Sequence, residues 1–297
     1  TRLSREAPVP VLELLRRELI LGGAANPARN VVALGGAATQ VGVVGADPEG
    51  EQLRALLRAA AIADAGLVVS PGRPTTRKSR ILADEAPPLP QQIARLDRLD
   101  PAPLAPAEQA RVVEALAALV PRHDLVICSD YQLGLLTAPV VARVRELCRA
   151  HGALFCVDAQ GSSHLYVGAD LFRCNNREAE AALGAPLRDE ADYQAGLARL
   201  RSELGARLVI VTRGPEGLSL AGEGQPYAHI PAARASEVYD TTGAGDTFIA
   251  VASLALAAGL GALAAAHMAN AAAALVVRRY GNAVVPPDEL AAALRAY

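Results

Sequence analysis

The sequence predicts an α/β domain with a mostly parallel central sheet and helices on both faces. Short apolar runs alternate along the chain with segments rich in Ala, Leu and Arg, a rhythm typical of strand–helix–strand units. The apolar runs are continuous, which indicates strands buried on both faces. The length of 297 residues suffices for one large domain of this class. Functional residues are expected at the carboxyl ends of the strands, where such sheets bind ligands.

The expected elements follow in order. Strands are predicted at 38–45, 124–130, 153–159 and 207–214, and helices at 47–60, 137–152, about 244–258 and 263–279. The first helix opens on Asp47 with an acidic first turn, and the second closes on Gly152. The segments 8–15 and 79–83 do not fit this rhythm, and we expect them to form a small extra sheet over the site. Residues 83–92 are rich in proline and predict a loop.

Composition excludes several classes of function. The net charge is −2, from 29 basic and 31 acidic residues, so there is no basic surplus for binding nucleic acid. No apolar run is long enough for a membrane span, and the opening residues lack the apolar core of a signal peptide. The cysteines, Cys128, Cys148, Cys156 and Cys174, lack zinc-type spacing, so we expect buried thiols in a reducing cytoplasm. P-loop, strand-linked GxGxxG and GxSxG motifs are also missing.

The string YDTTGAGDTF at 239–248 carries the strongest chemical signal. Gly243, Ala244 and Gly245 are small and precede an Ala-rich helix, so backbone N–H groups and the helix dipole can bind a phosphate there without a lysine. The carboxylate of Asp246, in the same turn, would repel that phosphate. The economical explanation is that Asp246 is a general base, which takes a proton from a substrate hydroxyl as its oxygen attacks phosphorus. The alternative is that Asp246 caps the helix and the glycines form a tight turn.

The stretch DTTGAGD at 240–246 resembles the C-terminal signature of the ribokinase/PfkB family of carbohydrate kinases. The resemblance implies a three-layer α/β/α sandwich with a small β lid, and ATP-dependent chemistry with Mg²⁺. LGGAANPARNVVALGG at 21–36 is similar to the family's glycine motif. By that resemblance Gly22, Gly23 and Asn26 contact the sugar; the alternative is a glycine-rich turn before a helix.

Three further stretches resemble the family's nucleotide site. NNRE at 175–178 is similar to its NxxE element, which implies that Asn175 and Glu178 arrange Mg²⁺ through water; an ordinary helix cap is the alternative. VTRGPEG at 211–217 is similar to the nucleotide-binding strand and turn, and this likeness implies that Thr212, Gly214 and Gly217 lie near ATP. Asn270 matches the helix that borders the adenine, or else is a satisfied polar residue.

Within the family, the likeness is strongest to kinases of D-glycero-β-D-manno-heptose 7-phosphate, and it covers nearly the whole chain. It is carried by REAPVPVLE at 5–13, LGGAANPARN at 21–30, RPTTRKSRILA at 73–83, QQIARLDR at 91–98 and SDYQLGLLT at 129–137. The implied reaction is phosphorylation at O1, giving the 1,7-bisphosphate. Such kinases are often fused to a nucleotidyltransferase with an HxGH motif, which none of the five histidines forms. We therefore expect one kinase domain over 1–297, with lid segments at about 1–20 and 72–100.

The lid region offers groups for a phosphorylated sugar. Lys78, Arg80 and Arg95 are candidates to hold its phosphate, and Lys78 is the chain's only lysine. Asp97 and Asp130 are candidates to bond sugar hydroxyls. The alternatives are solvated surface charge for the basic residues and turn or strand-end positions for the acidic ones. The segment 8–15 could supply an apolar face for pairing of lids, so a homodimer is expected.

Four departures from the family pattern leave other interpretations open. The family's first strand, with a GDxxxD-like motif, would precede Thr1. Three explanations are open: residues were omitted from the sequence, another segment takes the place of the strand, or part of the sugar site is missing. DYGKG is DYQLG here, so Leu133 replaces a lysine, and VDPKG is VDAQG, so Gln160 replaces another. Leu99 stands where an acidic residue is usual. These departures favour two alternatives: a kinase of another sugar, sugar phosphate or nucleoside, or a non-catalytic homologue that binds sugar phosphate or nucleotide.

Overall fold

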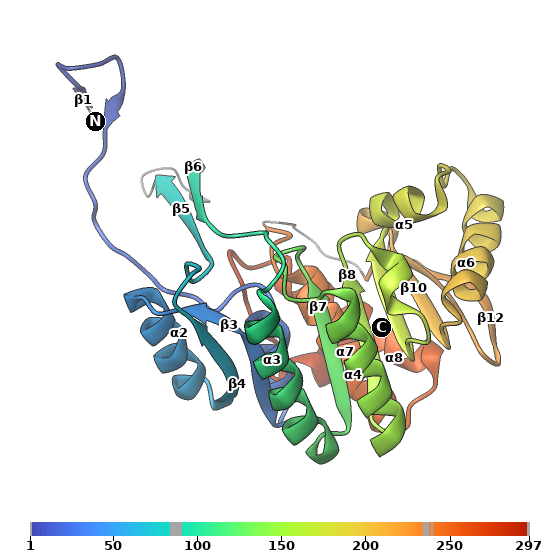
Figure 1. The fold of residues 1–297 in the computed structure, drawn as a ribbon. Helices are drawn as coiled ribbons and strands as arrows, with labels where there is room; N and C mark the ends of the chain where they lie inside the picture. The colour runs from blue at the N-terminus through green and yellow to red at the C-terminus, as the bar shows by residue number, and fades with distance from the viewer. Residues whose placement is uncertain (1, 84–90, 234–237, 239, 296–297) are drawn as a thin grey trace.

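The computed structural model describes residues 2–83, 91–233, 238 and 240–295. Its main sheet has six strands in the order β12-β11-β10-β9-β8-β7 (Figure 1). The parallel strands are β7 (Leu125–Asp130), β8 (Leu154–Ala159), β9 (Leu171–Asn175) and β10 (Leu208–Thr212), and the antiparallel pair β11 (Leu218–Gly222) and β12 (Gln225–Ile230) completes one edge. A second parallel pair consists of β3 (Ala38–Gly45) and β4 (Ile62–Ser70). The mostly parallel α/β prediction is confirmed.

Helices cover both faces of the main sheet. One face carries α3 (Pro106–Leu119), α4 (Ala138–His151), α5 (Asn176–Leu183) and α6 (Glu190–Leu204), and the other carries α7 (Ala244–Ala257), α8 (Ala262–Val276) and α9 (Pro287–Arg295) (Figure 1). The remaining helices are α1 (Ala25–Ala33), α2 (Pro48–Ala59), and the short η1 (Val120–Arg122), η2 (Ser163–Tyr166) and η3 (Gly214–Glu216). Buried strand residues alternate between the two faces: Phe172 packs with the α4 side and Leu171 with the α7 side.

Local sequence signals explain the element boundaries. The Asp47 carboxylate caps α2 by accepting the Gly50 N–H at 3.0 Å, and α4 ends on Gly152 as predicted. The predicted strand 207–214 stops at Thr212 because the chain enters the short η3 helix at Gly214. The helix predicted to reach residue 279 ends at Val276, before a turn in which Arg279 N–H bonds the Val276 carbonyl.

The prediction that 8–15 and 79–83 share one extra sheet is wrong. Residues 79–83 belong to β5 (Arg77–Ala83), which pairs with β6 (Gln91–Arg98). Of the earlier segment, Pro10–Val11 forms β2, which pairs with β1 (Arg2–Leu3) in a separate hairpin, and the rest is irregular. Apolar side chains of this segment do not pack on a sheet, and Leu14 is 81% exposed. Figure 1 shows this hairpin standing away from the body, beyond β5 and β6. Residues 84–90 of the predicted loop lie outside the described residues.

The parallel strands are divided between two sheets. Within the described residues, β3 pairs with β4 alone and β7 pairs with β8 alone, so each keeps one unpaired edge, and no described segment takes the place of a further strand. Helices join the two sheets: α1 packs on β3 and α7, while α3 packs on β3, β4 and α4. This packing brings Asn26 of α1 to the start of α7.

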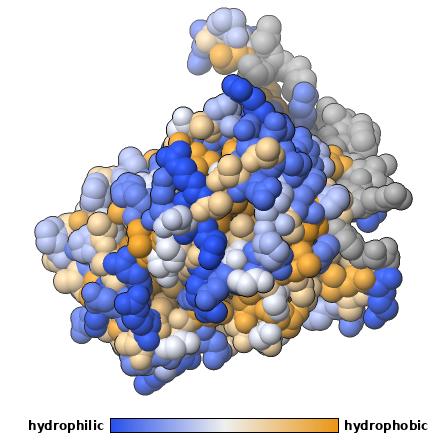
Figure 2. All heavy atoms as spheres, turned by 90° about the vertical axis from the view of Figure 1, so that its right-hand side faces the viewer, coloured by the Kyte–Doolittle hydropathy of each residue, from blue (hydrophilic) through white to orange (hydrophobic). Residues whose placement is uncertain are grey.

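The outer surface is mixed in character. The face that carries α5, α6 and β12 shows hydrophilic and hydrophobic side chains intermingled (Figure 2). None of the helices in the described part of the chain has the length and apolar character needed to cross a membrane. The four cysteines are all buried and free, as expected for reduced thiols.

Candidate active site

The carboxyl ends of three neighbouring strands place polar side chains on the face that α7 covers. Asp158 on β8 is directly paired with Arg173 on β9, and Thr212 on β10 is paired with Asn175. Val157, Cys174 and Val211 belong to the core on the α4 side. Because side chains alternate along a strand, Asp158, Arg173 and Thr212 point to the opposite side, toward the start of α7.

Asp246 lies in the first turn of α7 and is 6% exposed. Its Oδ2 accepts a 2.9 Å hydrogen bond from Asn26 Nδ2, and its Oδ1 accepts a 2.7 Å hydrogen bond from the Tyr131 hydroxyl. The Asp246 side chain does not cap α7, so the alternative of a capping role is wrong. The N-cap is Gly243, and α7 has no side-chain capping bond. The carboxylate is therefore aimed across the turn, toward residues that follow β7 and open α1.

Burial sets the charge state of this carboxylate. Burial raises the pKa of Asp246 to about 6; the bonds from Asn26 and Tyr131 oppose this increase, and the nearby Asp158 adds to it. An acid with that pKa is ionised at neutral pH and remains basic enough to accept a proton. Burial, followed by the charge of Asp246, raises the pKa of Tyr131, so its phenol stays protonated as a donor.

The glycine turn before Asp246 packs closely against polar side chains. Gly243 has φ +81°, a left-handed conformation that favours glycine, and a Cβ there would lie 2.8 Å from Asn26 Nδ2. A Cβ on Gly245 would lie 2.8 Å from Nη1 of Arg173. The turn thus presents backbone N–H groups at a helix N-terminus, with a guanidinium directly behind it. Tyr239, the first residue of the motif, lies outside the described residues.

Asn175 and Glu178 form a helix cap that also faces the site. The Asn175 side-chain oxygen accepts the Glu178 N–H at 3.0 Å, and Glu178 Oε2 accepts the Asn175 N–H at 2.7 Å. Burial raises the pKa of Glu178, although the Asn175 N–H and the Arg173 charge lower it. The backbone bond uses Oε2 of Glu178, so Oε1 is the carboxylate oxygen that would approach a hydrated cation.

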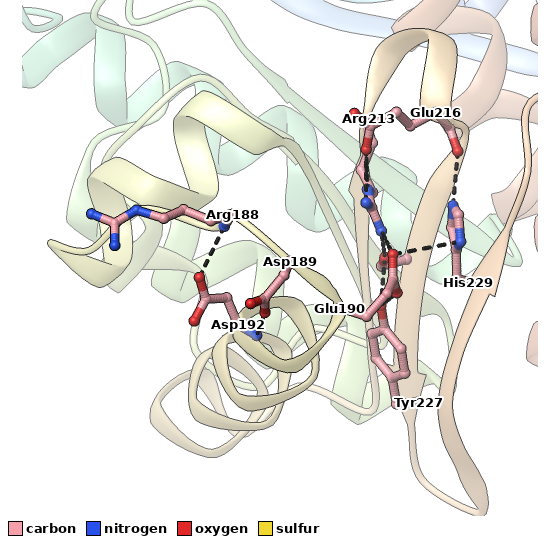
Figure 3. A network of polar contacts seen from close by, with 9 residues as sticks. Arg188, Asp189, Glu190, Asp192, Arg213, Glu216, Tyr227 and His229 are labelled. Carbon is pink, nitrogen blue, oxygen red and sulfur yellow. Dashed lines mark hydrogen bonds and ion pairs between the residues drawn. The ribbon is translucent and has the colours of Figure 1, made fainter.

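A network of charges holds the outer side of the Gly214–Gly217 turn (Figure 3). Arg213 bonds Glu190 at 2.6 Å and Glu216 at 2.7 Å, and the Tyr227 hydroxyl donates to Glu190. His229 Nε2 lies 2.8 Å from the Glu216 carbonyl oxygen. Gly214 and Gly217 both have positive φ within this turn. Nearby, Asn270 donates to the Pro231 carbonyl at 2.8 Å, which fixes the chain after β12.

The residues predicted to bind the sugar lie in the glycine motif and on β5. Gly22 and Gly23 directly precede α1, and Asn26 on that helix is fully buried. Its Oδ1 has no hydrogen-bond partner among the described residues, although its Nδ2 binds Asp246. Lys78 Nζ lies 5.5 Å from the centroid of the Tyr131 ring, within reach of a cation–π contact. The described structure thus gathers Asn26, Lys78, Tyr131 and Asp246 around one place.

The remaining lid candidates lie on the β5–β6 ribbon or are used internally. Arg80 is directly opposite Arg95, and Arg95 bonds Asp97 at 3.0 Å, so these side chains share one surface. Asp130 accepts bonds from the Tyr166 hydroxyl at 2.6 Å and from the Gln132 N–H at 2.8 Å. The roles given to these residues in sugar binding stay predictions.

The site's polar groups fit a nucleotide phosphate with a hydrated cation. No cluster of three or more metal-binding side chains occurs in the described parts of the chain. Mg²⁺ keeps several waters and binds through one or two carboxylates plus phosphates, so Glu178 beside an anion site suits it. Nη1 and Nη2 of Arg173 lie next to Gly245, and its Nε is buried without a partner among the described residues, so the guanidinium has donors left for a phosphate.

Comparison with known proteins agrees with this geometry. The family model described as pfkB family carbohydrate kinase matches residues 3–289. The chain belongs to the pfkB family of carbohydrate kinases. Among curated relatives of this pfkB chain, the bifunctional protein HldE of Geobacter sulfurreducens is 38% identical over 99% of it, and that of Caulobacter vibrioides is 40% identical over 98%. The chain spans 59% of the length of each.

Solved structures share the fold of this pfkB chain. Escherichia coli phosphofructokinase-2 in complex with fructose-6-phosphate has a TM-score of 0.77 at 18% identity, covering 93% of this chain and 86% of that one. Arabidopsis thaliana ribokinase complexed with ribose and ATP has a TM-score of 0.73 at 21% identity, covering 92% and 87%. The ribokinase-like fold expected from the sequence is confirmed.

Three residues of the pfkB site were missed by sequence reasoning. Tyr131 follows β7 within SDYQLGLLT, yet no rule about spacing points its hydroxyl at a helix 115 residues away. Arg173 and Asp158 form a 2.7 Å ion pair with side chains 12% and 10% exposed. A signal for Arg173 existed, because a charged residue inside the buried run LFRCN needs a partner or a ligand.

Proposed function

We propose that this chain transfers the terminal phosphoryl group of ATP to a hydroxyl of a phosphorylated sugar, with Asp246 as general base. The observation that carries the proposal is the Asp246 carboxylate, buried and held by two donors beside the glycine turn that opens α7. A protein that only bound phosphate would gain nothing from an acidic side chain there.

The transfer step moves one proton and one phosphoryl group. Asp246 accepts the hydroxyl proton while the sugar oxygen forms a bond to the terminal phosphorus of ATP. The bond from that phosphorus to the bridging oxygen breaks, and its electron pair leaves with ADP. Backbone N–H groups of Gly243, Gly245 and Asp246 stabilise the charge that spreads over the transferring group, which is the largest expected contribution. The N–H of Ala244, expected to join them, instead donates to the Thr241 carbonyl at 3.2 Å. Each carboxylate oxygen of Asp246 has a second lone pair, so the hydroxyl can bind beside Tyr131 or Asn26.

The nucleotide side holds the donor. Thr212, Gly214 and Gly217 would border the nucleotide, Asn270 the adenine, and Asn175 with Glu178 would hold Mg²⁺ through water. Bound Mg²⁺ would neutralise phosphate charge. The ion-paired network around Arg213 keeps the Gly214–Gly217 turn in place before the nucleotide arrives.

The substrate proposed is D-glycero-β-D-manno-heptose 7-phosphate, phosphorylated at O1 to the 1,7-bisphosphate. It is supported by the resemblance over nearly the whole chain and by Lys78, a cation on the lid beside the ring of Tyr131. Gly22, Gly23 and Asn26 would bind hydroxyls, with Arg80, Arg95, Asp97 and Asp130 as further contacts. Leu133 and Gln160, in place of two lysines, favour a second candidate: another sugar phosphate.

An ATP-consumption panel tests both candidates. The panel compares heptose 7-phosphate with fructose 6-phosphate, ribose and a nucleoside at equal concentrations. We expect the highest kcat/KM for heptose 7-phosphate. A higher value for another sugar would transfer the proposal to that sugar, while nucleotide binding without ADP formation from any of them would contradict the kinase proposal itself.

We also propose a cytoplasmic location and a homodimer. The buried free thiols support a reducing compartment. Exposed apolar side chains on the N-terminal arm, among them Leu12, Leu14 and Leu15, and on β6, Ile93 and Leu96, support pairing of lids between subunits. Sedimentation at micromolar concentration should give a dimer; a monomer would contradict the assembly.

A further inference from the structure

Arg173 is a charged side chain that the proposed reaction has not yet used. It comes from the interior of β9, in the buried run between Phe172 and Cys174. Its Nη1 donates to Asp158 Oδ1 at 2.7 Å, and its Nη2 donates to Thr212 Oγ1 at 2.7 Å. These bonds hold the plane of the guanidinium across three neighbouring strands. They restrict an arginine side chain that would otherwise be flexible.

The guanidinium retains unused donors. Arginine has five N–H groups, and the two bonds above take two of them. Nε is buried and has no partner anywhere in the described residues. A buried donor without an acceptor is costly in a folded protein, and its retention is explained if a ligand supplies the acceptor.

The location of the guanidinium indicates which ligand that is. A Cβ on Gly245 would lie 2.8 Å from Nη1 and 3.2 Å from Nη2 of Arg173, so the guanidinium rests directly against the glycine turn. The turn has two sides: Asn26 and Tyr131 contact Asp246 on the sugar side, while Thr212 and Asp158 contact Arg173 on the other. A group on this second side, behind the amides that receive the phosphoryl, faces the donor and not the sugar.

We propose that Arg173 binds the terminal phosphate of the nucleotide and stabilises the phosphoryl group during transfer. The inference rests on the proposed kinase function and deepens it. It also supplies a fixed cation in a chain where Leu133 and Gln160 stand in place of two lysines of the family pattern. Burial lowers the pKa of Arg173, but the Asp158 charge and hydrogen bond more than offset this, so the group stays positive at all working pH values.

The competing explanation is that Arg173 only ties the strand ends together through Asp158. Calorimetric titration with two nucleotides in the presence of Mg²⁺ separates the two roles. The probes are β,γ-methylene-ATP, which has a terminal phosphate, and ADP, which lacks it. We expect Arg173→Met to weaken binding of the ATP analogue by about 10- to 100-fold, as for the loss of a charge-assisted bond, and to change ADP binding less than about threefold.

Matched variants keep the test sharp. Arg207→Met removes an ion pair between the same two strands, with Asp170 at 3.1 Å, from their opposite ends. This pair is more exposed than that of Arg173, and its loss should leave both affinities unchanged. Arg173→Lys keeps the charge and should recover part of the lost affinity. If Arg173→Met does not fold because Asp158 is left unpaired, the double variant Arg173→Met, Asp158→Asn removes both charges and should show the same selective loss.

Two results overturn the inference. One is a folded Arg173 variant that binds the ATP analogue as tightly as the wild type. The other is a variant that weakens the analogue and ADP equally, as a structural role requires. Failure of the kinase proposal is distinguishable, since it would appear in the wild type as absence of ADP formation in the sugar panel.

Discussion

The Tyr131 hydroxyl donates a 2.7 Å hydrogen bond to Oδ1 of Asp246. The face of the same ring lies 5.5 Å from Lys78 Nζ on β5. One aromatic side chain therefore contacts both the lid and the proposed base. A change in the position of β5 can reach the carboxylate through this ring, which would link the proposed binding of sugar phosphate by Lys78 to the alignment of Asp246.

Replacing Tyr131 by phenylalanine should weaken the base's ionised form. The hydrogen bond lowers the pKa of Asp246 against the effect of burial, so its loss raises that pKa further. The acid limb of the kcat/KM profile should move up by about one pH unit, as expected for a lost bond to a charged group. Thermal unfolding of the variant serves as a control for folding. An unmoved acid limb would show that Tyr131 does not act on Asp246.

Activity should fall below pH 6. The pKa of Asp246 is raised to about 6, so the base is progressively protonated as the pH falls through that value. The profile of kcat/KM for the sugar phosphate should be measured between pH 5 and 8 with saturating ATP and Mg²⁺. We expect kcat/KM to decline on the acid side as for the protonation of a single group. A profile that stays flat to pH 5 would exclude Asp246, in this environment, as the base.

The same pKa shift affects stability with the opposite sign. The folded state holds the Asp246 proton up to about pH 6, whereas the unfolded state releases it near pH 3.8. The free energy of unfolding contributed by this group is therefore greatest below about pH 4 and is lost as the pH rises to 6, by roughly 1–3 kcal/mol. Asp246→Asn should lack this component in denaturant titrations at pH 4 and 7. Equal pH dependence in both proteins would contradict the shift.

Gly245→Ala should damage the phosphate turn. A methyl group would lie 2.8 Å from Arg173 Nη1, and the guanidinium is held by Asp158 and Thr212. Crowding of this kind costs about 1–3 kcal/mol of stability, and we expect kcat to fall by about tenfold or more as the anion site narrows. Gly261→Ala, where a Cβ meets nothing within 4 Å, is the control for activity and should keep the wild-type kcat. Because Gly261 is the N-cap of α8, a small loss of stability is expected there. Equal activity of both variants would mean that the turn has room to spare.

Lys78→Met should weaken sugar-phosphate binding selectively. Loss of the lid cation removes a charge-assisted bond, so KM for the sugar phosphate should rise by about 10-fold or more while KM for ATP stays constant. Lys78→Arg keeps the charge and should restore most of the affinity. A parallel increase in both KM values would argue that Lys78 acts through lid folding and not through the sugar phosphate.

Much of the fold was predictable because its signals are local. Asp47, Gly152 and the continuous apolar runs mark where α2, α4 and the buried strands begin and end. The prediction of one extra sheet was wrong because a short segment such as 8–15 can form a strand without specifying which edge it joins. No local sequence signal predicts that β1 pairs with β2, and β5 with β6, in two separate sheets.

The residues of the candidate site also fall into a group that was predictable from the sequence and a group that was not. Asp246 and the glycine turn were predictable because their chemistry lies within one short string. Tyr131 and Arg173 act through contacts between distant segments, such as the pairing of β8 with β9 that brings Asp158 to Arg173. The Arg173 contact depends on the register of the sheet, and the Tyr131 contact depends on how α7 packs against β7. The sequence pattern alone specifies neither.

The most direct measurement of the central claim is ADP formation by Asp246→Asn, with the sugar phosphate preferred by the wild type. Removing the base should lower kcat by about 10²- to 10⁴-fold, while β,γ-methylene-ATP still binds and the protein remains folded. A variant that turns over within a few-fold of the wild type would show that some other group takes the hydroxyl proton, and the account of this site would be wrong.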